Sequence, residues 1–154
     1  MILWRISNHP DLTGAGGLLR AGRWHSRGRP VVYLAESAAG ALLDALVHIE
    51  ASHPGELPRS YQLLEVGIPE HGADTASITR DCRNLEDGWQ GTLRATRRVG
   101  DDWLASGASL LLRVPSAVVG RTFNYLFNPL HPLAAQSRIL SLARYPFDDR
   151  LLGS

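Results

Sequence analysis

Residues able to do chemistry concentrate in one loop and on the helix that should follow it. Residues 22–30 carry three arginines, two glycines and a histidine, and the planar arginine fork suits phosphate oxygens. Asp44 and His48 stand four residues apart and share a helix face with Gly40 and Ala41, so this carboxylate is placed to border a pocket. A solvated basic turn and a polar helix surface are the ordinary explanations, and spacing alone favours them.

The sequence lacks the motifs of several common metal-binding, nucleotide-binding and catalytic sites. The six histidines show no His-x-x-x-His spacing, and the single Cys82 excludes both an internal disulfide and a cysteine-rich metal site. We therefore expect no metal. The sequence has no Walker loop, no Gly-x-Gly-x-x-Gly and no Gly-x-Ser-x-Gly elbow, so Ser116 has no motif that marks it as a nucleophile.

The composition excludes some partners. The 154 residues include sixteen basic and fifteen acidic side chains, and every basic one is arginine. With a net charge of +1 there is no global field to attract nucleic acid or anionic lipid. No apolar run approaches the length that spans a membrane, and the N-terminus lacks a signal-peptide pattern. We expect a cytoplasmic protein that binds neither membrane nor nucleic acid directly.

The expected secondary structure alternates short strands with a few helices. Strands are predicted at 2–6, 31–35, 61–68, 109–114 and 139–147, extended structure at 117–119, and helices at 38–51 and 93–106. Ser37 should cap the first helix, whose core-facing band is Leu42, Leu43, Leu46, Val47 and Ile49. Residues 70–90 read as irregular, and residues 124–132 as an ordered loop or short helix entry. The pattern predicts a single α+β domain over 1–154.

Taken in order, several segments resemble the RES domain. They are Leu-Trp-Arg-Ile at 3–6, Ala-Gly-Arg-Trp at 21–24, Val-Tyr-Leu-Ala at 32–35, the helix at 41–48, Leu-Arg-Val-Pro-Ser-Ala-Val-Val at 112–119, and Asn-Tyr-Leu-x-Asn-Pro-x-His at 124–131. The resemblance runs almost end to end and is weakest at 70–91. It implies a fold related to ADP-ribosyltransferases.

The resemblance also implies a function. The chain is similar to the toxins of two-component toxin-antitoxin systems. The resemblance implies that its partner is an Xre-like helix-turn-helix antitoxin and that it forms a homodimer within the toxin-antitoxin complex. Such toxins deplete NAD by hydrolysis or phosphorolysis, or ADP-ribosylate a protein. By position, the resemblance implies catalytic roles for Arg23, Asp44 and Ser116, and it implies NAD-binding positions at Arg5, Arg23, Tyr33, Ser116 and Asn124. Asp44 stands where the family has glutamate.

These positions suggest a mechanism. Nicotinamide leaves NAD as a neutral group from a cationic ring, so the protein must chiefly stabilise a ribosyl cation, which an Asp44 carboxylate would do. Arg5 and Arg23 would pair with the pyrophosphate, Tyr33 would offer an aromatic face, and Ser116 would hydrogen-bond the ligand. Because Asp44 is one methylene shorter than glutamate, a catalytically weak regulator that binds NAD or an antitoxin remains the alternative to an NAD-consuming enzyme.

Overall fold

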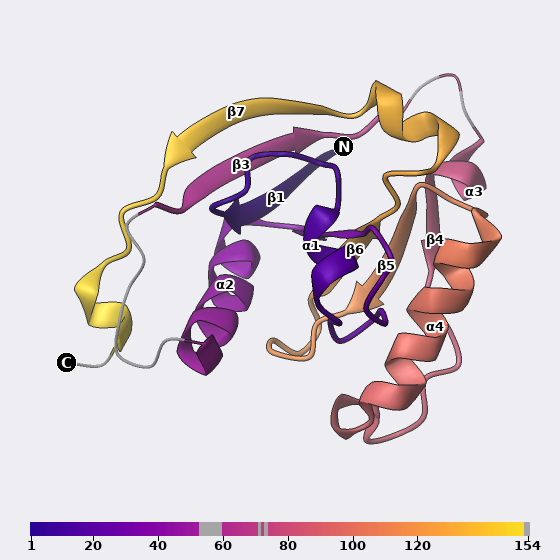
Figure 1. The fold of residues 1–154 in the computed structure, drawn as a ribbon, viewed down its shortest axis with the longest axis horizontal. Helices are drawn as coiled ribbons and strands as arrows, with labels where there is room; N and C mark the ends of the chain where they lie inside the picture. The colour runs from indigo at the N-terminus through magenta and orange to yellow at the C-terminus, as the bar shows by residue number, and fades with distance from the viewer. Residues whose placement is uncertain (53–59, 71, 73, 153–154) are drawn as a thin grey trace.

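The computed structural model describes residues 1–52, 60–70, 72 and 74–152, and its strands form one seven-stranded mixed sheet (Figure 1). The strands are β1 (Ile2–Ser7), β2 (Val32–Ala35), β3 (Gln62–Gly67), β4 (Thr79–Asp81), β5 (Leu111–Pro115), β6 (Phe123–Phe127) and β7 (Arg138–Arg144). Their order across the sheet is β4-β5-β6-β2-β1-β3-β7, and only the β4–β5 pair is parallel. The predicted α+β class is confirmed.

The helices are few and mostly short. They are α1 (Ala15–Leu19), α2 (Ala38–Ser52), α3 (Thr75–Ile78) and α4 (Leu93–Ser106), with 3-10 turns η1 (Trp89–Gly91), η2 (Pro132–Gln136) and η3 (Asp149–Leu152). Helix α4 has the predicted bounds. The Ser37 hydroxyl accepts a hydrogen bond from the Gly40 N–H at 3.0 Å, so the predicted cap of α2 is confirmed.

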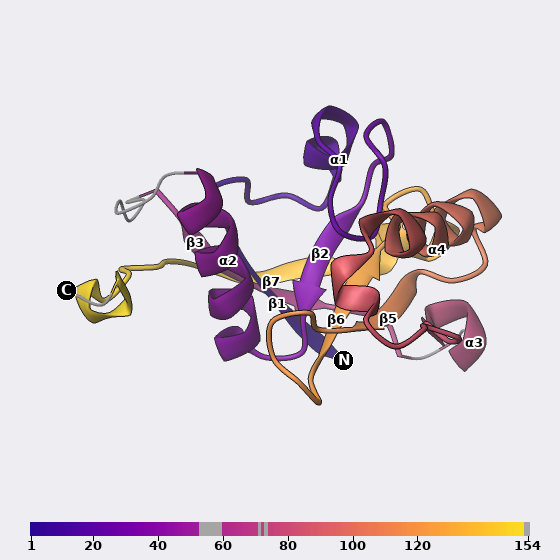
Figure 2. The same cartoon turned by 90° about the horizontal axis from the view of Figure 1, so that it is seen from below.

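Both long helices cover the same face of the sheet at separate places (Figure 2). Helix α2 packs Ala41 and Ala45 against β1 and β2. Helix α4 packs Trp103 against Leu112 and Leu126 of β5 and β6. The middle of the sheet, where β2 and β6 pair, therefore lies between the two helices.

The expected apolar band of α2 does not form the main contact with the sheet. Ala41 and Ala45 are 5% and 7% exposed, whereas Leu43 and Val47 are 39% and 49% exposed. Alanines four residues apart let the helix backbone approach the strands closely, and larger side chains on that stripe would hold it away. Leu42 of the predicted band packs beside these alanines, so only part of the band contacts the core, and the side chain of Ile49 lies outside the described residues.

Three segments differ from their expected conformation. Residues 75–81 form α3 and β4 where irregular structure was expected, and residues 117–119 form a bend where extended structure was expected. Residues 124–127 belong to β6, which is inserted between β5 and β2, and only then does the short η2 follow. Residues 79–81 and 124–127 become strands by pairing with other strands, which local propensity does not register, whereas residues 117–119 bend because the Ser116 hydroxyl accepts hydrogen bonds from N–H groups of that segment.

Candidate functional site

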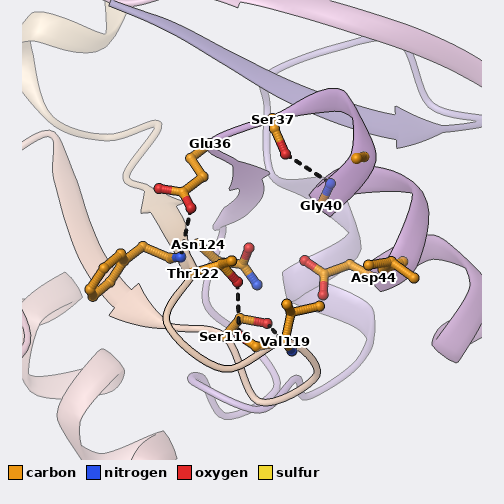
Figure 3. A pocket seen from close by; sticks show the side chains of 11 residues that line it. Glu36, Ser37, Gly40, Asp44, Ser116, Val119, Thr122 and Asn124 are labelled. Carbon is orange, nitrogen blue, oxygen red and sulfur yellow. Dashed lines mark hydrogen bonds between the residues drawn. The ribbon is translucent and has the colours of Figure 1, made fainter.

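A hollow lies between the start of α2 and the turn that joins β5 to β6 (Figure 3). Its cavity volume is about 130 Å³, room for a few water molecules or one ring of a ligand. The lining residues come from segments far apart in sequence: Glu36, Ser37, Ala39, Gly40, Leu43, Asp44, Ser116, Val119, Thr122, Phe123 and Asn124. The fold thus gathers Asp44, Ser116 and Asn124, three of the expected site residues, around one hollow.

Asp44 is half-buried, and its carboxylate is directed toward the Asn124 amide (Figure 3). Burial raises the pKa of this carboxyl, while hydrogen bonding by the Asn124 side chain and the nearby His48 oppose the rise. Asn124 meets Asp44 because it lies opposite Ala35, on the sheet face that α2 covers. Asp44 therefore borders a pocket and not an open polar surface, while Ala41, expected on the same helix face, packs into the core.

Ser116 shapes the turn that forms the other wall of the hollow. Its hydroxyl oxygen accepts hydrogen bonds from the N–H groups of Val118 and Val119, both at 3.1 Å, and its own N–H donates to the Thr122 carbonyl at 2.9 Å. Both acceptor positions of the hydroxyl are used, so its remaining capacity is to donate one proton. This geometry suits a hydrogen bond from the Ser116 hydroxyl to a bound ligand.

Glu36 and Thr122 line the hollow although they were not among the expected site residues. One Glu36 carboxylate oxygen accepts a hydrogen bond from the Phe123 N–H at 3.2 Å, which ties the end of β2 to the start of β6 (Figure 3). Its position directly between the strand and the Ser37 cap was the available signal, since side chains at such junctions lie at the end of the sheet. The hollow therefore has two carboxylates, Glu36 and Asp44.

Tyr33 lies on the same sheet face, but its hydroxyl is used within the protein. It accepts a hydrogen bond from the Trp24 N–H at 3.1 Å and lies 2.8 Å from His25 Nδ1. His25 Nε2 is 2.8 Å from the Arg20 carbonyl, which can only accept, so the proton of the neutral ring is on Nε2 and Tyr33 donates to Nδ1. Burial lowers the pKa of His25, in agreement with a neutral ring.

The basic loop is packed against α4 and is not simply a solvated turn. Trp24 and His25 are 3% and 4% exposed, and the Ser26 N–H and hydroxyl both donate to the Asp101 carboxylate. A Cβ at Gly100 would overlap the Trp24 carbonyl, which explains a glycine inside this helix. The loop and α4 therefore form one closely packed unit.

Arg23 projects from this loop toward η1. Its Nη1 donates to the Gln90 carbonyl at 2.8 Å, and its guanidinium stands over the Trp89 ring, 5.9 Å from the centroid. Its backbone carbonyl accepts from the Thr96 hydroxyl at 2.6 Å. Arg23 is thus on the helix-covered side of the molecule, outside the residues that line the hollow.

Arg5 lies on the other face of the sheet. Trp4 pairs with Ala35, and Ala35 with Asn124, so these three share a face and the next residue, Arg5, points away from it. Its guanidinium donates to the carbonyls of Asp11 at 3.0 Å and His9 at 3.4 Å, and burial lowers its pKa. The structure does not bring Arg5 together with Asp44 and Asn124.

The described residues contain neither a cluster of metal ligands nor a helix able to span a membrane. In that part of the chain, no group of three or more His, Cys, Asp or Glu side chains is arranged to hold a metal ion. Across the same residues, no helix combines the length and the apolar character needed to cross a membrane.

The fold is similar to that of a known toxin-antitoxin structure. The solved MbcT-MbcA toxin-antitoxin complex of M. tuberculosis contains a chain that matches with a TM-score of 0.68 and 18% identity, over 99% of this chain and 86% of that one. At this identity the likeness concerns the fold alone.

Sequence comparison defines the family. The RES domain model matches residues 2–148, and the chain belongs to the RES domain family. A protein named Toxin Res from Pseudomonas putida is 46% identical over 151 residues, covering 98% of this chain and 99% of the relative. The Prs ADP-ribosylating toxin of a Sphingobium species is 32% identical, covering 97% and 95% respectively. The family predicted from the sequence is confirmed.

Proposed function

We propose that the protein is the toxin of a toxin-antitoxin pair and that it binds NAD and cleaves the bond between nicotinamide and ribose. The observation that carries this proposal is the half-buried Asp44 carboxylate, which faces Asn124 and Ser116 across a hollow in a chain of the RES family. The relatives named as toxins support the biological role. We further propose that it acts in the cytoplasm as a homodimer, held inactive by an Xre-like helix-turn-helix antitoxin.

Cleavage makes one main demand on the protein. The C–N bond to the pyridinium breaks, its electron pair stays with nicotinamide, and positive charge develops on the ribose. Asp44 would stabilise that charge, and its partial burial strengthens the interaction because less water screens it. Asn124 would hold the carboxylate in orientation, and the free Ser116 proton would hydrogen-bond the ribose or the amide.

The hollow suits the nicotinamide end of NAD and is too small for the whole dinucleotide. Leu126 lies two residues after Asn124 in β6, so both side chains are on the same sheet face, and Leu126 pairs with Tyr33. Tyr33 contacts the basic loop, so this face connects the hollow with that loop. We propose that the pyrophosphate lies there and that Arg23 exchanges its Gln90 contact for a phosphate oxygen. Arg5, on the opposite face, has no place in this arrangement.

ADP-ribosylation of a protein is the second candidate function. It is favoured by the relative named Prs ADP-ribosylating toxin. Both reactions break the same bond and differ in whether water, phosphate or a protein side chain takes the ribosyl carbon. A catalytically weak regulator is the third reading, since Asp44 is shorter than the glutamate that the family resemblance implies.

The test is to incubate the purified protein with NAD and measure free nicotinamide, with and without inorganic phosphate. We expect nicotinamide release that is lost in Asp44→Asn, while Asp102→Asn on the exposed side of α4 serves as a charge-matched control. Acceleration by phosphate identifies phosphorolysis. Release that requires added cell proteins, with label from NAD on one of them, identifies ADP-ribosylation. If a folded protein binds NAD but releases no nicotinamide under any of these conditions, the result supports the catalytically weak regulator.

A further inference from the structure

The hollow carries negative charge with no cation to balance it among its lining residues. Glu36 and Asp44 contribute two carboxylates, and none of the described lining residues is arginine or lysine. His48, on the same helix as Asp44, opposes the rise in the pKa of the Asp44 carboxyl. Arg113, near the hollow, is already placed over the Phe123 ring and paired with Asp81 at 3.4 Å.

The remaining lining combines apolar and neutral polar groups. Leu43 and Val119 are apolar, and the Ser116 hydroxyl proton and the Asn124 amide can hydrogen-bond an uncharged group. This combination fits a flat cationic ring that carries a neutral amide. A carboxylate in place of the amide would place a negative charge beside the Glu36 and Asp44 carboxylates, with no cation among the described lining residues to compensate it.

We propose that the hollow selects N-substituted pyridinium rings bearing an uncharged carboxamide, and that Glu36 is a specificity-determining residue which rejects the corresponding carboxylate. This inference rests on the proposed function, because it places the nicotinamide ring of NAD in the hollow. The disfavoured analogue is the deamido dinucleotide, in which nicotinate replaces nicotinamide and the rest of the molecule is unchanged.

Glu36 is suited to this role because, within the part of the chain that the structure describes, only one of its carboxylate oxygens has a hydrogen-bond partner. One oxygen accepts from the Phe123 N–H, and the residue lines the hollow across from Asp44 (Figure 3). Glu36→Gln keeps an oxygen that can accept the same hydrogen bond and removes the charge. The substitution therefore separates the charge of Glu36 from its link to β6.

The experiment compares kcat/KM for NAD and for deamido-NAD in the parent, in Glu36→Gln and in Asp102→Asn, with thermal melts to establish folding. We expect the parent to favour NAD by about fivefold, since the exposed Glu36, screened by water, and the half-buried Asp44 both repel a carboxylate in the hollow. Glu36→Gln should lower that ratio severalfold, and Asp102→Asn should leave it unchanged. A parent ratio near one, or an unchanged ratio in folded Glu36→Gln, overturns the inference.

A binding measurement separates failure of the inference from failure of the proposed function. The probes are 1-methylnicotinamide, a cation, and 1-methylnicotinate, its zwitterionic counterpart, neither of which carries phosphate. Calorimetry should detect tighter binding of the cation, whether or not the protein cleaves NAD. If no NAD is cleaved but the cation is preferred, the reaction is wrong and the selectivity stands. If NAD is cleaved and the two probes bind equally, the selectivity is wrong and the reaction stands.

Discussion

Tyr33→Phe should lower the free energy of unfolding by more than the loss of a single hydrogen bond would. The Tyr33 hydroxyl is bonded to both the Trp24 N–H and His25 Nδ1, in a loop where these two residues are 3% and 4% exposed. Phenylalanine leaves both groups without a partner, and each such loss costs about 1–3 kcal/mol. We therefore expect a decrease of about 2–6 kcal/mol in the free energy of unfolding. For a chain of this size the midpoint would fall by about 4–24 °C.

Urea denaturation and thermal melts measure this change, with Tyr125→Phe as the control. Tyr125 lies on the other face of the sheet, and its hydroxyl has no hydrogen bond to another described residue, so that change should stay within about 0.5 kcal/mol. A double-mutant cycle tests the hydrogen bond between Tyr33 and His25. The variant with both Tyr33→Phe and His25→Phe should be destabilised less than the sum of the two single variants, and the difference should exceed about 0.5 kcal/mol. A Tyr33→Phe protein as stable as the parent would refute the assigned hydrogen bonds.

Three further predictions concern the carboxylate, the buried histidine and the helix glycine. Asp44→Asn should lower the rate of nicotinamide release on the order of a hundredfold. It should not lower the melting temperature at pH 7, because burial disfavours the charge that the substitution removes. Asp44→Glu lengthens the side chain by about 1 Å and should raise the rate of release. Since burial lowers the pKa of His25 in the folded state, the unfolded chain takes up the proton more readily, and stability should fall as the pH drops below 6.5. Denaturation between pH 8 and 5 should show a weaker fall in His25→Asn than in the parent, and an equal fall in the two proteins would contradict this. Gly100→Ala should reduce the free energy of unfolding by about 1–3 kcal/mol, because the added Cβ would overlap the Trp24 carbonyl. This loss should exceed the gain from the better helix propensity of alanine. A variant that is more stable than the parent in urea denaturation would contradict the contact.

The elements with strong local signals were predictable from the sequence. Helix α4 begins and ends where its residues indicated, and α2 starts at the predicted Ser37 cap. The bounds of the apolar strands β2 and β5 were predicted to within one or two residues. These signals are carried by residues close together in the chain, so no knowledge of the tertiary fold was needed.

The arrangement of the site depended on contacts between distant residues. Arg5 and Trp4 are neighbours in one strand, and only the pairing of β1 with β2 decides which of them shares a face with Asn124. Local sequence likewise gave no reason to bury Trp24 and His25 in an arginine-rich loop, since the groups that hold them belong to Tyr33 and α4. Glu36 was not predicted to border the site because its partner, Phe123, is 87 positions away.

The position of β6 in the middle of the sheet affects when the protein can become active during its synthesis. Asp44 and Asn124 are 80 residues apart, and the wall that carries Ser116 exists only after β6 has been inserted between β2 and β5. At about 5–20 residues per second, a ribosome needs roughly 4–16 s to travel from one to the other. A nascent chain that has exposed α2 therefore has half a catalytic site and no enclosing wall. If the protein cleaves NAD as proposed, that activity is withheld until translation is almost finished, and an antitoxin already present has that interval in which to meet its partner.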